Sequence, residues 1–152
     1  MDSEIFEGNP HRMMKIYKKA VAVLAVSSLF SVCAHASQEA FTQNAIKDVF
    51  NSMGGTWTPF LVDVADGKAL ILLEQQSISL DFFLVALPTG VCALSAQDGY
   101  LSTVREVAIL NSAGDQGYVF EGGREACARV YSESGGYSDA LIRARTREHV
   151  VQ

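Results

Sequence analysis

Carboxylates, a histidine and a pair of cysteines are the residues of this chain that could carry chemistry. Five acidic residues stand in or beside segments with strand-like patterns: Asp63, Glu74, Asp81, Glu106 and Glu121. Two carboxylates on one sheet face could lie within the several ångströms that glycoside hydrolysis requires. Apolar neighbours such as Val62 and Val64 indicate the alternative, in which the acids alternate outward onto a solvated face. A carboxylate-dependent glycan hydrolase therefore stays open, with no catalytic residue assigned.

Other catalytic classes lack the residues that they need after Ala36. His149 is the single histidine there, and a residue so near the C-terminus is hard to hold rigidly beside a nucleophile. A zinc site usually needs three or four ligands, which Cys92, Cys127 and His149 could approach only with free thiols. The glycine doublets lack the strand, loop and helix context of a phosphate-binding loop. We therefore predict no metal site and no cofactor.

Cys92 and Cys127 form an even pair, which in an oxidising compartment predicts a disulfide. The closed loop of about 36 residues corresponds, in the chain-entropy relation, to roughly 4 kcal/mol of stabilisation. A redox or metal-binding pair is the alternative, although the sequence contains no C-x-x-C spacing.

Residues 13–36 contain the three parts of a secretory signal peptide in the right order. Basic residues between Met14 and Lys19 precede the uncharged segment from Ala20 to Val32, and the cleavage motif Ala34-His35-Ala36 follows. The uncharged segment is shorter than the roughly 20 apolar residues that span a bilayer as a helix. We expect cleavage after Ala36 and export to the periplasm or the medium, with no stable membrane span left.

The first residues leave two further questions. Residues 1–12 are acidic, whereas signal peptides begin with basic residues, so we interpret them as an upstream extension and place the start at Met13 or Met14. Cys33 raises a lipoprotein alternative, but Val32 is not the small residue expected before a lipidated cysteine. The predicted domains are therefore 1–12 (extension), 13–36 (signal peptide), 37–137 (one α+β domain) and 138–152 (a C-terminal helix or tail).

The predicted mature chain, residues 37–152, is acidic. It holds eight basic and 14 acidic residues, a net charge of −6. Such a charge argues against nucleic acid and against an anionic membrane surface as partners. The remaining candidates are an envelope or secreted protein, or a second copy of the chain as a homodimer.

The apolar stretch from Phe60 to Leu94 organises the predicted fold. Asp66-Gly67 between two apolar runs predicts a type I′ hairpin, because both positions need positive φ. Period-two alternation from Ser77 to Phe82 predicts a strand, which becomes apolar on both faces through Leu87. A turn at Pro88-Thr89-Gly90 and a further strand over Val91 to Ala96 would follow.

Helices are predicted on either side of this sheet. Residues 37–53 carry an apolar stripe at helical spacing and end at Gly54-Gly55. Residues 101–111 fit a helix or a strand, and a possible partner strand at 118–120 favours the strand. Residues 126–131 fit a short strand or a helical turn. Ser138 would cap a helix over 140–150, whose polar end is either a solvated tail or a segment ordered by a partner.

These elements predict an α+β fold: an N-terminal amphipathic helix packed on an antiparallel sheet of about five to seven strands, with one disulfide and a short C-terminal helix. One amphipathic helix cannot cover both faces of that sheet, and an uncovered apolar face marks an interaction surface. We expect a non-enzymatic protein-binding or accessory module of the bacterial cell envelope, with Trp57, Phe83 and Val85 in the binding surface. A glycan hydrolase and a secreted toxin or inhibitor are the alternatives.

Overall fold

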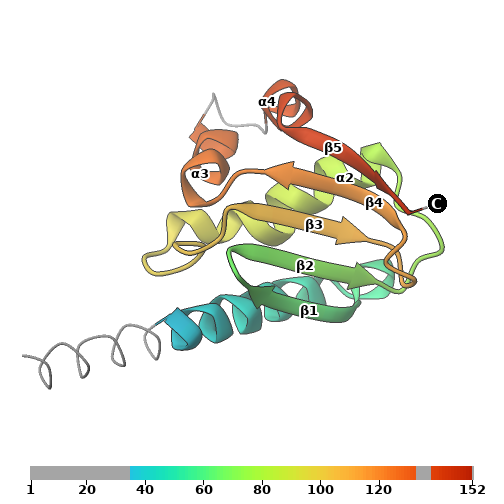
Figure 1. Cartoon of the computed structure of the whole chain (residues 1–152). Helices are drawn as coiled ribbons and strands as arrows, with labels where there is room; N and C mark the ends of the chain where they lie inside the picture. Colours follow the sequence, from blue (N-terminus) through green and yellow to red (C-terminus); the bar gives the residue numbers. More distant parts are fainter. Residues whose placement is uncertain (1–34, 133–137, 152) are drawn as a thin grey trace, which may run out of the picture. The chain divides into compact units, whose positions relative to one another are not determined.

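Five strands form one mixed sheet in the computed structural model, which describes residues 35–132 and 138–151. The strands are β1 (Pro59–Ala65), β2 (Lys68–Leu73), β3 (Glu106–Leu110), β4 (Gln116–Glu121) and β5 (Thr146–Val150), in the spatial order β1-β2-β3-β4-β5 (Figure 1). Each neighbouring pair is antiparallel except β2 and β3, which are parallel. The α+β class is therefore confirmed, whereas the prediction of a purely antiparallel sheet is wrong.

The hairpin between β1 and β2 turns at the predicted residues. Asp66 and Gly67 both have positive φ, 54° and 82°, as a type I′ turn requires. The carbonyl oxygen of Gly67 accepts hydrogen bonds from the backbone N–H groups of Arg105 (2.7 Å) and Glu106 (3.1 Å). The hairpin tip is thereby tied to the start of β3, which brings the parallel strand into register.

Helical segments replace the strands that were predicted between residues 77 and 96. The helices are α2 (Leu80–Ala86), the π-helical turn η2 (Leu87–Val91) and the 3-10 turn η3 (Cys92–Ala96). The oxygen of the Ser79 side chain accepts a hydrogen bond from the N–H of Phe82 (3.1 Å), and Asp81 lies in the first turn. These are helix-start signals, and parallel β2 and β3 need such a crossover between them.

Gly90 shows why the chain stays helical past Pro88. A Cβ atom at Gly90 would overlap the ring of Phe50, so the glycine serves a close helix–helix contact instead of a turn. The wider π-helical turn accommodates proline within the helical path.

The C-terminal part of the chain returns to the sheet. The helix α3 (Arg124–Ser132) covers the segment predicted as a strand or helical turn. Ser138 caps α4 (Asp139–Ala144) by accepting a hydrogen bond from the N–H of Leu141 (3.3 Å), as predicted. The helix then stops, and residues 146–150 pair with β4. The prediction of a helix to Val150, or of a solvated tail, is therefore wrong from Thr146 onward.

The main core lies between the sheet and the helices, which occupy one face of it (Figure 1). Residues 35–53 are helical, and Ile46 and Phe50 of this helix are completely buried. The predicted disulfide is present between Cys92 at the start of η3 and Cys127 in α3, and both cysteines are completely buried. It fixes α3 against the helical crossover, so the disulfide prediction is confirmed.

The predicted extension (1–12) and the predicted signal peptide up to residue 34 lie outside the described residues. Among the helices that the structure describes, none has the length and apolar character needed to cross a bilayer.

A buried asparagine joins the β3–β4 turn to the segment after β2. The Asn111 side chain, 5% exposed, donates to the carbonyl oxygen of Gln76 (3.0 Å) and to Oδ1 of Asp115 (2.7 Å). Its Oδ1 accepts from the N–H groups of Asp115 (3.1 Å) and Gln116 (3.2 Å). The side chain of Gln116 continues the network through both backbone groups of Ile78.

Asn111→Ala is expected to lower the free energy of unfolding by about 2–3 kcal/mol, because it leaves several buried polar groups without partners. Urea denaturation followed by circular dichroism measures the change. Asn44→Ala, on the exposed side of the first helix, is the matched control and is expected to stay within about 0.5 kcal/mol of the native chain. Equal effects of the two substitutions would contradict a structural role for the network.

Candidate functional site

The face of the sheet opposite the helices is the main candidate site, and we call it the open face. Alternate residues of the strands build it, because side chains on one strand point to opposite faces in turn. Strand register places them in three rows: Ala65, Lys68, Glu106 and Glu121; then Asp63, Leu70, Ala108, Val119 and Arg147; then Leu61, Leu72, Leu110, Gly117 and His149. No helix of the described residues packs on this face (Figure 1).

The centre of the open face is apolar. Ala108, Leu110 and Val119 form a second buried cluster, separate from the main core, against which Leu70 and Leu72 pack. At the edge of this cluster, Leu61 is 43% exposed. Ala108, Leu110 and Val119 are only 2–5% exposed. The apolar surface that a second protein can contact therefore comes from the leucines beside them, Leu61, Leu70 and Leu72.

Charged residues border the apolar centre. Glu106 forms one ion pair with Lys68 (Nζ to Oε1, 3.0 Å) and another with Arg147 (Nη2 to Oε2, 3.2 Å). Arg147 also reaches Glu121 (Nε to Oε1, 3.3 Å). Asp63 lies at the opposite edge, on β1, and forms no ion pair with any described residue. The border therefore has an acid, Asp63, on β1 and a base, Arg147, on β5 at the other end of the face.

Burial by itself raises the pKa of Glu106, but the hydrogen bonds and charges of Lys68 and Arg147 outweigh it and lower the pKa of this carboxyl below its usual range. A general acid in glycoside hydrolysis needs a raised pKa instead. Of the five acids that the sequence analysis considered, the structure brings Glu106 and Glu121 together, and both pair with Arg147. Glu74, after β2, and Asp81, on α2, are exposed and lie outside the open face.

The lowered pKa of Glu106 has a consequence for acid stability. A carboxyl whose pKa is lower in the folded state adds stability above the unfolded pKa of about 4.3 and loses it as the pH falls through the folded pKa. We expect the unfolding free energy of Glu106→Gln to fall less steeply than that of the native chain below about pH 4.3.

Urea titrations at a series of acidic pH values measure this difference. Glu74→Gln, at an exposed position, is the control and is expected to follow the native profile. Parallel profiles for the native chain and Glu106→Gln would contradict the assignment.

The predicted binding residues do not form one surface. Phe83 is completely buried in the main core, whereas Val85 on the same helix is 48% exposed. Trp57 is partly buried, with its ring 4.7 Å from that of Phe82 and 6.3 Å from that of Phe50. The prediction of Phe83 as a binding residue is therefore wrong, because residues 80–86 form a helix and not a strand with two apolar faces.

The open face was missed, although the sequence carries a signal for it. In β1, Leu61 and Asp63 alternate with the buried Val62 and Val64. In β2, the apolar run hides the same alternation, because both of its faces are apolar.

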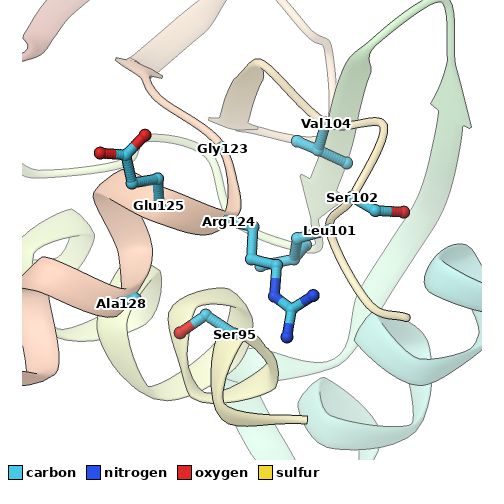
Figure 2. Close-up of a pocket in the computed structure, with 8 residues that line it drawn as sticks. All are labelled: Ser95, Leu101, Ser102, Val104, Gly123, Arg124, Glu125 and Ala128. Carbon is cyan, nitrogen blue, oxygen red and sulfur yellow. The ribbon is translucent and has the colours of Figure 1, made fainter. Parts of the chain in front are cut away.

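A hollow at the start of α3 has a volume of about 620 Å³. Figure 2 shows Arg124 extending into this hollow and Glu125 pointing away from it. The Arg124 guanidinium pairs with the carboxylate of Asp98 (Nη2 to Oδ1, 2.9 Å). The hollow is wide open to solvent. Its lining residues are Ser95, Leu101, Ser102, Val104, Gly123, Arg124, Glu125 and Ala128, and they do not bring an acidic and a basic side chain together inside it. It does not resemble an active site.

The described residues also contain no group of three histidine, cysteine or acidic side chains that could hold a metal ion. His149 lies on the open face, and its Nε2 is 3.3 Å from the carbonyl oxygen of Gly114. Comparison with known proteins adds no assignment: no family model matches the chain, and neither a curated protein nor a solved structure shows significant similarity to it. The open face therefore remains the candidate functional site.

Proposed function

We propose that this chain is a small exported, non-enzymatic module of the bacterial envelope that binds another protein through the open face of its sheet. The observation that carries the proposal is the second apolar cluster, which includes Ala108, Leu110 and Val119 and over which none of the described helices packs. An apolar patch with a polar rim is typical of a protein interface. The rim here consists of Asp63 on one side and the Lys68–Glu106–Arg147 ion pairs on the other.

Export is supported by the signal-peptide pattern of residues 13–36 and by a disulfide that suits an oxidising compartment. The intact mass of the protein from the envelope or the medium tests it. We expect a chain that begins at Ser37 and is two hydrogen atoms lighter than its reduced form. A full-length mass with two alkylatable thiols would contradict export.

Two lysine variants test the binding surface, one at a leucine and one at a valine whose side chains are exposed to a similar extent. Leu61, on the open face, is 43% exposed, and Val85, on the helical side, is 48% exposed. Tagged proteins are recovered from the native host after mild cross-linking, and mass spectrometry identifies what is attached. We expect Leu61→Lys to lose the attached protein and Val85→Lys to keep it.

Both variants are first compared with the native chain by circular dichroism and thermal unfolding, since exposed substitutions usually change stability by less than about 0.5 kcal/mol. Loss of the attached protein from Val85→Lys but not from Leu61→Lys would refute the open face as the binding surface. The identity of the attached protein also separates an accessory module from a toxin or inhibitor, which would be found on its target.

A further inference from the structure

We infer that the occupant of the open face is a second copy of this chain, packed sheet to sheet about a two-fold axis that runs along β3. The inference rests on the proposed binding role of the open face. It comes from the order of the residues in the three rows. One two-fold rotation sets oppositely charged residues of the two copies against each other at both edges of the face, and the other sets like charges there.

Two rotations place one copy of a sheet face against another with the strands of the two copies aligned, as in stacked sheets. Rotation about an axis parallel to the strands sets β1 of one copy opposite β5 of the other and keeps each row opposite itself. Rotation about an axis perpendicular to the strands sets each strand opposite its own copy. Two-fold contacts of both kinds pair the same patch with itself, so the pattern of residues decides between them.

The charges favour the axis along β3. In the middle row, Asp63 on β1 then lies opposite Arg147 on β5 of the second copy, at both ends of the interface. In the charged row, Lys68 lies opposite Glu121. Glu106, on β3, meets its own copy at the axis, but each of the two carboxylates is already paired with Lys68 and Arg147 of its own chain. The perpendicular axis would instead set Asp63 against Asp63 and Arg147 against Arg147, and like charges in contact oppose association. Asp63 has no ion-pair partner among the described residues of its own chain.

The shapes favour the same axis. Ala108 lies on the axis at the centre of the middle row, and because it is only 4% exposed, it projects no side chain that would hold the two copies apart. In the third row, Leu72 lies opposite Gly117, which has no side chain, and Leu110 meets Leu110. Large residues thus face small ones or the axis, as in the interdigitated interior of two stacked sheets.

The size of the face sets the strength of the contact. Five strands about 4.8 Å apart and about five residues long make a face of roughly 24 by 17 Å. This area lies below the roughly 800 Å² that each partner buries in a standard stable interface. We therefore expect a reversible dimer whose dissociation constant is in the micromolar range, on the order of 10⁻⁶ to 10⁻⁴ M.

Charge exchange tests the arrangement on the chain from Ser37 to Gln152 with its disulfide intact. In Asp63→Arg, two arginines face each other at both ends of the interface, and in Arg147→Asp two aspartates do. A mixture of the two variants restores an opposite-charge pair at each end. We expect either variant alone to dimerise at least tenfold more weakly than the native chain, and the equimolar mixture to form a heterodimer.

Sedimentation equilibrium from about 1 to 500 µM, which brackets the expected dissociation constants, measures the native chain, each variant alone and the mixture, and mass-labelled chains identify the heterodimer. Glu148→Arg is the control: it is also an acid-to-arginine change on an edge strand, but Glu148 points to the helical side. We expect it to dimerise as the native chain does. If Arg147→Asp does not fold, Asp63→Arg alone decides, because Asp63 forms no ion pair with the residues that the structure describes.

A native chain that stays monomeric over this range, or an Asp63→Arg variant that dimerises unchanged, would overturn the inference. Failure of the proposed function is separable from this outcome. If the native chain is monomeric but Leu61→Lys still loses a different attached protein in the host, the open face binds and only its occupant is wrong. If neither a dimer nor any Leu61-dependent attachment is found, both proposals fail.

Discussion

Phe83→Ala is expected to lower the free energy of unfolding by about 3–5 kcal/mol, the usual cost of truncating a buried phenylalanine. Phe83 is completely buried, and its ring lies 5.5 Å from that of Tyr118, where α2 packs on β4. Domains of this size have net stabilities of about 5–15 kcal/mol, so the variant would lose a large share of its stability. Urea denaturation with tryptophan fluorescence measures the loss, since Trp57 belongs to the same core cluster.

Val85→Ala is the matched control on the same helix. Its side chain is 48% exposed, so the change is expected to stay within about 0.5 kcal/mol of the native chain. A small effect of Phe83→Ala, together with a loss of protein binding, would contradict the buried position of Phe83 and restore it as a surface residue.

Removal of the disulfide is expected to have an effect of similar size. The cysteines are 35 residues apart in sequence, and the chain-entropy relation gives roughly 4 kcal/mol for a loop of this length. We expect the double variant Cys92→Ala/Cys127→Ala to lose about that amount of unfolding free energy, because the crosslink then no longer restricts the unfolded chain. Urea denaturation of the variant against the oxidised native chain gives the difference.

Reductant supplies the control for the disulfide. Dithiothreitol is expected to destabilise the native chain toward the level of the double variant and to leave the double variant unchanged. A native chain whose urea midpoint does not move on complete reduction, confirmed by alkylation of both thiols, would show that the crosslink contributes little to stability.

Local signals in the sequence predicted several elements correctly. The Asp66-Gly67 hairpin follows from two adjacent positions that accept positive φ, and the cap at Ser138 follows from its hydroxyl. The disulfide follows from two cysteines in a chain that carries a signal-peptide pattern. Each of these depends on neighbouring residues or on residue type alone, so no knowledge of tertiary packing was needed.

The wrong predictions concern segments whose secondary structure is determined by tertiary packing. Residues 80–86 alternate like a strand over a few positions, yet their burial of Phe83, Leu84 and Ala86 is helical, and Ser79 begins the helix. Residues 146–150 are too polar to predict as a strand, but β4 offers them hydrogen bonds and Glu106 and Glu121 offer charge partners to Arg147. The open face could not be predicted without these two elements. It exists because the helices, α2 among them, pack on one side of the sheet only, and β5 is its last strand.

The most direct measurement of the central claim is site-specific photo-cross-linking in the native host. A photoreactive amino acid replaces Leu72, which lies on the open face, or Val85, which lies on the helical side. Covalent adducts are then separated by mass and identified. We predict one predominant protein adduct from position 72, a second copy of the chain if the two-fold arrangement holds, and no such adduct from position 85. Adducts from position 85 and none from position 72 would contradict the open face as the binding surface.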